Sequence, residues 1–514
     1  MQTARELQIE NDFLREKLDE KNQTLDQKNH YILQLEEALK QQRQQQFGAS
    51  SEKASVDQLG LFNEAEAIEA EVEAVTEGNA VTVQSHTRQK KPRVSIPEDL
   101  SREDIIHDLP EAEKTCPHDG AALKCIGSDD HEQLDIIPAQ VKVIRHKRLK
   151  YVCPCCDQHI VTADKPKQPI EKSIASPGLL AFVATQKYCD ALPLYRQSDI
   201  FNRLGIQLDR SNLANWMVKC GELVQPLINL LQDQLRDRSV VHMDETTLQV
   251  LKEPDKAPQS KSYLWLMSSF TEQPITLFHY DPSRSQQVPL DLLDTSVKAL
   301  MIDGYEWYQK ACDDYDIQRL GCWAHARRKF MDAKKIQPRG KTGKPDQALA
   351  FIQKLYAIEK HIKNDPPDQR YQMRQQQARP IIKQIKVWLD KSLLHVPPKT
   401  ALGKALVYLH NQWERLIGYL DDGRYPIDNN LAENAIRPFV VGRKNWLFAN
   451  SQAGAKASAN LYSLIQTAKA NGLNPYEYLK QVFRELPNAE NVEAIEVLLP
   501  WHINARENKN GLSA

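Results

Sequence analysis

Three acidic residues have types and surroundings that could support chemistry on phosphates: Asp244, Asp303 and Glu433. Asp244 lies within an apolar run, Asp303 directly follows another, and Glu433 lies in a segment rich in helix-forming residues. Carboxylates of this kind hold Mg²⁺ or Mn²⁺ together with water and phosphate oxygens. Two such ions about 4 Å apart can activate an attacking oxygen and stabilise the leaving oxygen of a phosphodiester. If the fold brings them together, the three acids would form a metal-dependent catalytic site.

The apolar runs around the first two acids predict the strands that would position them. Strand-like patterns cover 239–251, 263–267, 275–280 and 299–302, with a helix-like stretch before the last. Three strands, a helix and a fourth strand is the order expected of a ribonuclease-H-like sheet, in which the first and fourth strands are neighbours. This order would place Asp244 beside Asp303.

The segment 428–438 predicts a helix that carries Glu433 and begins at Asp428 or Asn429. A single acid at a strand end is more often a loop former or a helix cap than a metal ligand, so the interpretation depends on the strand order. Other acids in the same region could be mistaken for ligands: Glu245, Asp313, Asp314, Asp421, Asp422 and Asp428.

The cysteines predict a second, structural metal site. Cys153 and Cys156 form a Cys-x-x-Cys pair, and Cys116 is followed three residues later by Asp119, where another cysteine would complete a second pair. Two such pairs around a strand-like segment, 140–148, form the layout of a zinc ribbon. Asp119 or His118 could supply the fourth ligand. The alternative is a set of thiols that bind no metal.

Basic residues in four places could contact DNA phosphates or stabilise charge on a scissile strand. One group is the block 145–150, and a second is Arg210 in segment 197–216, whose pattern fits either a helix-turn-helix or an ordinary helical hairpin. The alternative is a solvated face or a flexible linker for the block 145–150, and a solvated edge for the basic residues near His325. The candidates are Arg145, Lys147, Arg148, Lys150, Arg210, His325, Arg327, Arg328 and Arg437.

Residues 7–39 repeat every seven positions and predict a coiled-coil helix. Leu18, Leu25 and Ile32 fall on one heptad position, and Asn11 occupies the same position earlier in the chain. One buried polar residue makes a zipper register-specific but weak. We expect a homo-oligomer formed through this zipper. The alternative is an amphipathic helix that packs on its own chain.

The composition fits a soluble multidomain α+β protein. The chain has 514 residues and a net charge of −1, a length sufficient for about three to four domains. It has no apolar stretch of about 18 residues and a polar start, so we expect neither a membrane span nor a secretory signal. Nine cysteines are too few for a disulfide scaffold, which favours the reducing cytoplasm.

Seven regions follow from these patterns, with a helical insertion inside the catalytic domain. They are a coiled-coil helix (1–46), a mostly disordered linker (47–110), a zinc-ribbon-like DNA-binding module (111–165), a helical segment (170–236), the ribonuclease-H-like domain (237–335 and 421–485), the helical insertion (336–420) and a C-terminal tail (486–514).

Taken together, these features resemble the transposases of the insertion sequence 66 group, which belong to the DDE class of bacterial transposases. The resemblance is nearly full-length and rests on strings that are specific in combination: Phe47–Lys53, Glu132–Pro138, Tyr151–Cys153, Ser176–Leu180, Leu192–Gln197, Asp244–Thr246, Asp303–Tyr305, Gly321–Phe330 and Asp428–Pro438. Asp119 departs from the family pattern, which has a cysteine there.

The resemblance implies that Asp244, Asp303 and Glu433 are the catalytic triad and that the N-terminal part binds zinc. It also implies that the protein recognises the terminal inverted repeats of its own element and inserts into target DNA, with small accessory proteins of that element as further partners. We therefore expect Mg²⁺-dependent cleavage and joining of DNA strands. The alternatives are a catalytically silent zinc-containing DNA-binding regulator or assembly protein, and a nuclease that cuts without joining.

Overall fold

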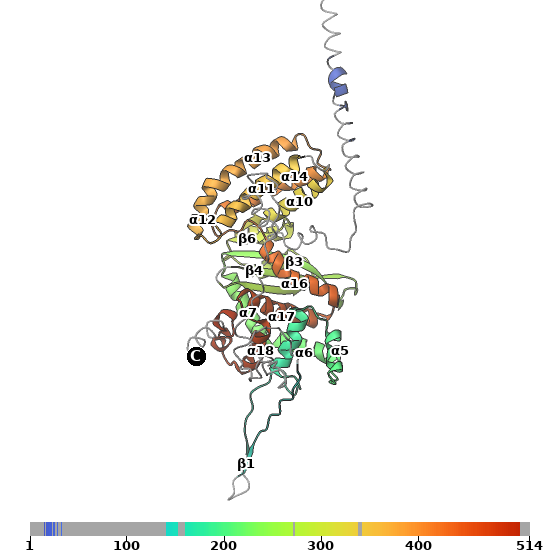
Figure 1. Cartoon of the computed structure of the whole chain (residues 1–514), viewed down its shortest axis with the longest axis vertical. Helices are drawn as coiled ribbons and strands as arrows, with labels where there is room; N and C mark the ends of the chain where they lie inside the picture. Colours follow the sequence, from blue (N-terminus) through green and yellow to red (C-terminus); the bar gives the residue numbers. More distant parts are fainter. Residues whose placement is uncertain are drawn as a thin grey trace, which may run out of the picture. The chain divides into compact units, whose positions relative to one another are not determined.

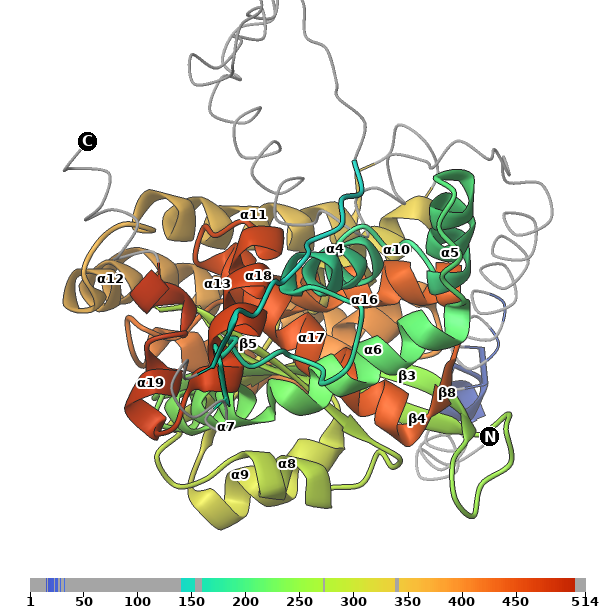
Figure 2. The ribbon, with the colours of Figure 1, turned by 90° about the horizontal axis from the view of Figure 1, so that it is seen from below.

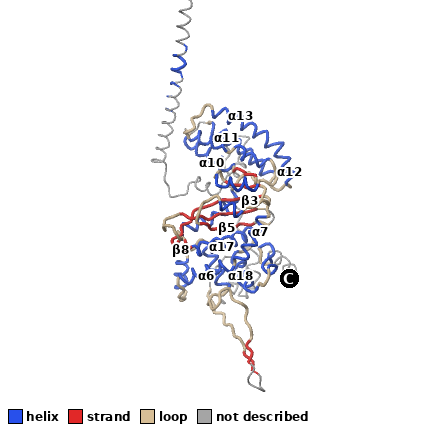
Figure 3. Tube along the Cα trace, turned by 180° about the vertical axis from the view of Figure 1, so that it is seen from behind, coloured by secondary structure: helices blue, strands red, loops and turns tan. Residues whose placement is uncertain are grey.

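The computed structural model describes eleven helical residues between positions 15 and 32, and then residues 140–152, 160–270, 273–337 and 342–503. The described chain divides into two compact units, with the boundary between Ala163 and Asp164. Figure 1 shows the whole chain, and Figure 3 shows its helices and strands. Among the described residues, no helix has the length and apolar character needed to cross a membrane.

The larger unit is built on a mixed sheet whose strands follow the order β5-β4-β3-β6-β7. Strands β3, β4 and β5 are antiparallel neighbours, whereas β6 pairs parallel with β3 and β7 pairs parallel with β6. The adjacency predicted for the first and fourth strands is confirmed. The bounds are β3 Val240–Lys252, β4 Lys261–Ser269, β5 Ile275–Asp281, β6 Ala299–Ile302 and β7 Gln318–Gly321. The sequence interpretation missed β7 and the short β8 (Ala449–Ser451), which pairs with the end of β3.

Alternating side chains of the sheet enter two separate hydrophobic cores. In β6, Leu300 and Ile302 belong to one core, and Ala299 and Met301 belong to the other. The first core includes helices α4 (Pro177–Tyr188), α6 (Arg210–Leu223), α7 (Gln225–Arg236), α17 (Gln452–Ala470) and α18 (Pro475–Glu485). The second includes α10 (Trp323–Ile336) and the inserted helices. Helices therefore cover both faces, as Figures 1 and 2 show.

A helical insertion separates α10 from the helix that carries Glu433. It consists of α11 (Lys344–His361), α12 (Pro367–Met373), the π-helix η3 (Arg374–Ala378), α13 (Arg379–Leu393), α14 (Ala401–Asn411), α15 (Trp413–Ile417) and η4 (Gly418–Leu420). Arg374 is fully buried at its centre, where its guanidinium donates to both carboxylate oxygens of Glu359 and to three main-chain oxygens. The inserted helices therefore pack as an ordered group around the second core, which they share with α10 and one face of the sheet.

Side chains of helix α17 form hydrogen bonds with the free edge of strand β5. The hydroxyl of Ser463 accepts a hydrogen bond from Phe278 N at 2.8 Å, and the hydroxyl of Thr467 accepts from Thr276 N at 3.1 Å and donates to Thr276 O at 3.0 Å. An unpaired strand edge is a template for aggregation, and these side chains satisfy the exposed main-chain groups. The packing of α17 therefore completes the sheet.

The predicted helical segment before the sheet contains a helix, a tight turn and a second helix. Helix α5 (Leu194–Arg203) ends in a turn at Gly205, whose φ of +78° suits glycine. Helix α6 follows with Asp209 at its N-cap, and its Leu213, Trp216 and Met217 are buried. Arg210 is exposed, so the side chain considered in the sequence analysis as a DNA contact lies on the surface.

The smaller unit is described at residues 140–152 and 160–163 and contains one antiparallel pair, β1 (Lys150–Val152) with β2 (Ile160–Thr162). The strand expected over 140–148 is wrong, because these residues are exposed and lie outside any strand. Among the described residues no strand pairs with them, so their alternating pattern has nothing there to bury against. Cys116, Asp119, Cys153 and Cys156 lie outside the described residues, as does the linker 47–110.

The prediction of an unpacked C-terminal tail is wrong for most of its length. The expected C-terminal tail is packed as far as Ile503, with Leu498, Leu499 and Ile503 buried in the first core. Its helical pieces are η5 (Leu486–Asn488) and α19 (Val492–Glu496). At the N-terminus, Leu18, Leu25 and Ile32 are helical and between 52% and 60% exposed.

Candidate active site

The three predicted acids line one cavity of about 240 Å³ in the larger unit. Asp244 lies on β3, Asp303 directly follows β6, and Glu433 lies in the first turn of α16 (Asn430–Trp446). The parallel register pairs His242 with Met301, and two residues further along each strand come Asp244 and Asp303. The wall is completed by His325, Arg328, Asn429, Ile436, Arg437 and Val440.

The electrostatics of Asp244 reflect this crowding of acids. Burial raises the pKa of its carboxyl well above the usual value, and the negative charges of Glu245, Asp303 and Glu433 raise it further. The main-chain N–H of Glu245, which donates to Asp244 Oδ1 at 2.8 Å, opposes this shift. The cavity therefore disfavours the ionised form of Asp244 unless positive charge enters it.

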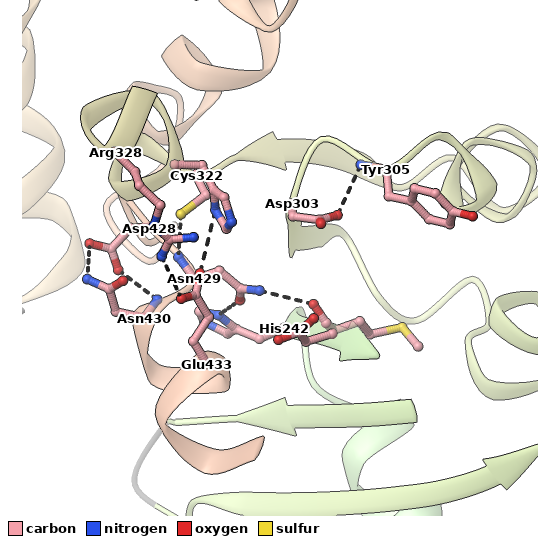
Figure 4. A network of polar contacts seen from close by, with 12 residues as sticks. His242, Asp303, Tyr305, Cys322, Arg328, Asp428, Asn429, Asn430 and Glu433 are labelled. Atoms are coloured by element: carbon pink, nitrogen blue, oxygen red, sulfur yellow. Dashed lines mark hydrogen bonds and ion pairs between the residues drawn. The ribbon is translucent and has the colours of Figure 1, made fainter. Parts of the chain in front are cut away.

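Two side chains of α10 lie next to Glu433, and one of them binds it. Arg328 Nη2 donates to Glu433 Oε2 at 3.2 Å, and His325 Nδ1 lies 3.5 Å from Glu433 Oε1. The side chain of Glu433 is 23% exposed, whereas its Oε1 atom is buried. Figure 4 shows Arg328 reaching toward Glu433.

Asn429 joins the helix of Glu433 to the strand of Asp244. Its Nδ2 donates to Met243 O at 3.0 Å, and its Oδ1 lies 2.9 Å from Nδ1 of the buried His242. Asn429 is the N-cap residue of α16, but its side chain makes no capping hydrogen bond, because it is used to reach β3. The sequence analysis considered Asn429 only as a cap and missed this role and that of His242.

A second network holds the loop that carries Asp303. Arg284 donates to Glu245 through Nε at 3.0 Å and through a short contact from Nη2, and Tyr308 OH also donates to Glu245. The guanidinium of Arg284 stacks 3.5 Å from the ring centre of Tyr305, whose main-chain N–H donates to Asp303 Oδ1. Burial raises the pKa of Glu245, although the hydrogen bonds from Tyr308 and Arg284 oppose the rise.

The predicted DNA-contacting residues fall into three groups in the structure. Arg145, Lys147, Arg148, Lys150 and Arg210 are exposed, and His325, Arg328 and Arg437 line the cavity. Arg327 is only 8% exposed, so its guanidinium has little surface to offer a DNA strand. Burial thus separates Arg327 from its neighbour Arg328, which faces the cavity.

Comparison with known protein families gives matches along most of the chain. The description "Transposase IS66 family" matches residues 172–457, and "IS66 C-terminal element" matches 463–501. "Zinc-finger binding domain of transposase IS66" matches 113–157, a range that includes Cys116, Asp119, Cys153 and Cys156. "Transposase C of IS166 homeodomain" matches 34–105.

Such a series of matches defines a transposase with a zinc-finger domain before its α/β unit. The chain belongs to the IS66 transposase family. Similar chains occur in Sinorhizobium fredii (strain NBRC 101917 / NGR234). The uncharacterized protein y4qI is 31% identical over 493 residues, which cover 92% of this chain and 89% of the relative. The uncharacterized protein y4jD is 31% identical over 425 residues, covering 80% and 82% respectively.

Proposed function

We propose that this chain is a DDE-type DNA transposase in which Asp244, Asp303 and Glu433 are the catalytic carboxylates. The observation that carries the proposal is their meeting in one cavity, although the second and third are separated by the whole helical insertion. The sheet order supports a ribonuclease-H-like catalytic domain, because one acid lies on β3, one directly follows the adjacent parallel strand β6, and one lies on a helix packed against β3.

The donor set of the cavity fits Mg²⁺. Three carboxylates supply the oxygen ligands that this cation prefers. Glu433 Oε1 is buried without a hydrogen-bond partner. Burial and the neighbouring negative charges raise the pKa of Asp244, and a bound cation would offset both effects. When bound, Mg²⁺ would supply Lewis-acid activation of an oxygen nucleophile and neutralise charge on the phosphate. Asp244, Asp303 and Glu433 are the residues that would hold it.

The other residues of the cavity have roles in binding and orientation. Arg328 fixes one oxygen of Glu433, and Arg328 and Arg437 add positive charge to the lining of the cavity that holds the three acids. A phosphodiester entering the cavity would therefore meet cationic groups as well as carboxylates. Hydrolysis of that bond by water leaves a 3′-hydroxyl, and attack of the hydroxyl on target DNA joins the strands.

The proposed substrates are the terminal inverted repeats of the chain's own element and a target DNA, which places the proposed site of action in the cytoplasm. The exposed basic residues of segment 145–150 and Arg210 would contact DNA phosphates outside the catalytic cavity. In the zinc finger, Cys116, Asp119, Cys153 and Cys156 are the proposed zinc ligands. Assembly through the heptad helix would bring two element ends together.

The test uses purified full-length protein, labelled DNA carrying the element ends, and Mg²⁺. Asp244→Asn should abolish end cleavage and leave end binding unchanged, whereas Asp314→Asn, in an exposed pair with Lys310, should cleave normally. Cleavage by Asp244→Asn at the wild-type rate would reject the proposal. Pre-cleaved ends with a free 3′-hydroxyl distinguish a transposase, which joins them to target DNA, from a nuclease, which does not.

A further inference from the structure

A thiol, an imidazole and a carboxylate converge beside the cavity. Among the described residues, the ligand atoms of Cys322, His325 and Glu433 all lie within 4.8 Å of one another. Cys322 is the N-cap residue of α10, and His325 lies in the first turn of the same helix. Glu433 lies in the first turn of α16. Figure 4 shows the sulfur of Cys322 close to Asn429 and Glu433.

Two atoms of this cluster lack hydrogen bonds. His325 Nδ1 and Glu433 Oε1 are both buried without a hydrogen-bond partner, and they face each other at 3.5 Å. Buried polar atoms normally have a hydrogen-bond partner. An ion or a proton between these two atoms would supply the missing interaction. The sulfur of Cys322, by contrast, already accepts a hydrogen bond from Asn429 N at 3.2 Å, which orients it as the outer contacts of metal ligands do.

The donor set distinguishes this cluster from the triad. Sulfur and imidazole nitrogen with one carboxylate oxygen suit Zn²⁺ and similar borderline cations, whereas Mg²⁺ prefers oxygen alone. We propose that Cys322, His325 and Glu433 form a second cation site, specific for a thiophilic divalent ion such as Zn²⁺ or Co²⁺. The site is separate from the zinc finger, because none of its ligands lies within residues 113–157.

Binding of a cation at this second site requires loss of the Cys322 proton and engages Glu433. Burial raises the pKa of the Cys322 thiol well above its usual value, and the acids Asp428 and Glu433 raise it further, so an entering cation must displace the thiol proton. Glu433 would be shared with the proposed catalytic site, and this consequence alone rests on the proposed function. Zn²⁺ at Cys322 would withdraw Glu433 from the Mg²⁺ site and inhibit cleavage.

The test measures Co²⁺ binding to metal-stripped full-length protein by atomic analysis and by the cobalt–thiolate charge-transfer absorbance. The zinc-finger cysteines contribute equally to every sample. Cys322→Ser should bind one fewer Co²⁺ per chain than wild type and lose part of the absorbance. Cys312→Ser, which alters a buried thiol of α9 (Gln309–Tyr315), should bind as wild type does.

Two further variants make the result decisive. His325→Gln keeps the thiol and should lose the same Co²⁺ equivalent, which covers the case in which Cys322→Ser does not fold. Asp244→Asn removes a proposed catalytic group but should retain the equivalent, so failure of the proposed catalysis and failure of this site are distinguishable. Equal Co²⁺ stoichiometry and equal spectra in wild type, Cys322→Ser and His325→Gln would overturn the proposal.

Discussion

Asn429, at the start of α16, donates from Nδ2 to the main-chain oxygen of Met243 at 3.0 Å. Met243 directly precedes Asp244, and Asn429 lies one helical turn before Glu433. One side chain therefore links the helix of Glu433 to the strand of Asp244, although the two acids are 189 positions apart in the sequence. The proposed chemistry depends on such positioning, because misplacement of a reacting group by about 1 Å can cost on the order of 100-fold in rate.

Replacing Asn429 by alanine should lower end cleavage by at least about 10-fold, because the helix of Glu433 loses its attachment to β3. The free energy of unfolding should fall by about 1–3 kcal/mol, since the buried His242 loses its partner. Asn411→Ala, at the exposed end of α14, should change neither. DNA cleavage assays and urea denaturation measure the two effects. Wild-type cleavage by Asn429→Ala would show that the clamp is not needed.

Asp244→Asn should stabilise the metal-free protein at neutral pH. An acid whose pKa is higher in the folded than in the unfolded chain contributes stability below its unfolded pKa and loses that contribution as pH rises through the folded pKa. The pKa of Asp244 is raised, and asparagine carries no charge to repel the other acids. The melting temperature of the variant should exceed that of wild type at pH 8, and the difference should vanish near pH 4.

The effect of Mg²⁺ on the melting temperature tests the same carboxylates in a second way. A cation that binds only the folded chain raises its melting temperature, so Mg²⁺ should stabilise wild type and have little effect on Asp244→Asn. Asp314→Asn should respond as wild type does. If the metal-free variant melts below wild type at pH 8, the carboxylates do not repel one another as inferred.

Arg284 and Glu245 form an ion pair whose carboxylate side chain is only 3% exposed and whose guanidinium is 33% exposed. Arg284→Gln leaves that carboxylate without its cation and should lower the free energy of unfolding by about 3 kcal/mol. The double variant Arg284→Gln/Glu245→Gln removes the buried charge and should recover part of the loss. Denaturant titration of all four proteins gives the coupling energy. Additive losses would show that the pair is not coupled.

The sequence predicts those parts of the fold whose strands show a clear local pattern of apolar residues. The four apolar runs gave the strands, and their order gave the adjacency that brings Asp244 toward Asp303. The main omission was β7, a four-residue strand with Arg319 within it, too short and too polar for a periodic signal. Asn429 and Cys322 were also missed as site residues, because their partners lie on other elements and no local spacing encodes those contacts.

The close packing between α6 and α17 could not be predicted from the sequence either. A Cβ atom at Gly221 would lie 2.4 Å from Ala457 Cα, so Gly221→Ala should destabilise the protein by about 1–3 kcal/mol through overpacking. Gly454→Ala, whose Cβ would meet only Ser451 Oγ at 3.6 Å, should be neutral or slightly stabilising because alanine favours helix. Thermal denaturation compares the two. Equal stability would mean that the helices separate without cost.

The heptad residues Leu18, Leu25 and Ile32 are helical yet more than half exposed in the single chain. Exposure of a regular apolar seam is unfavourable in water and favours pairing with another copy. Leu25→Lys should therefore reduce the mass measured by light scattering, whereas Thr24→Lys, on the adjacent exposed position, should not. If Leu25→Lys has the same mass as an oligomeric wild type, the chain assembles through another surface. If wild type is a monomer, the zipper does not bring two element ends together.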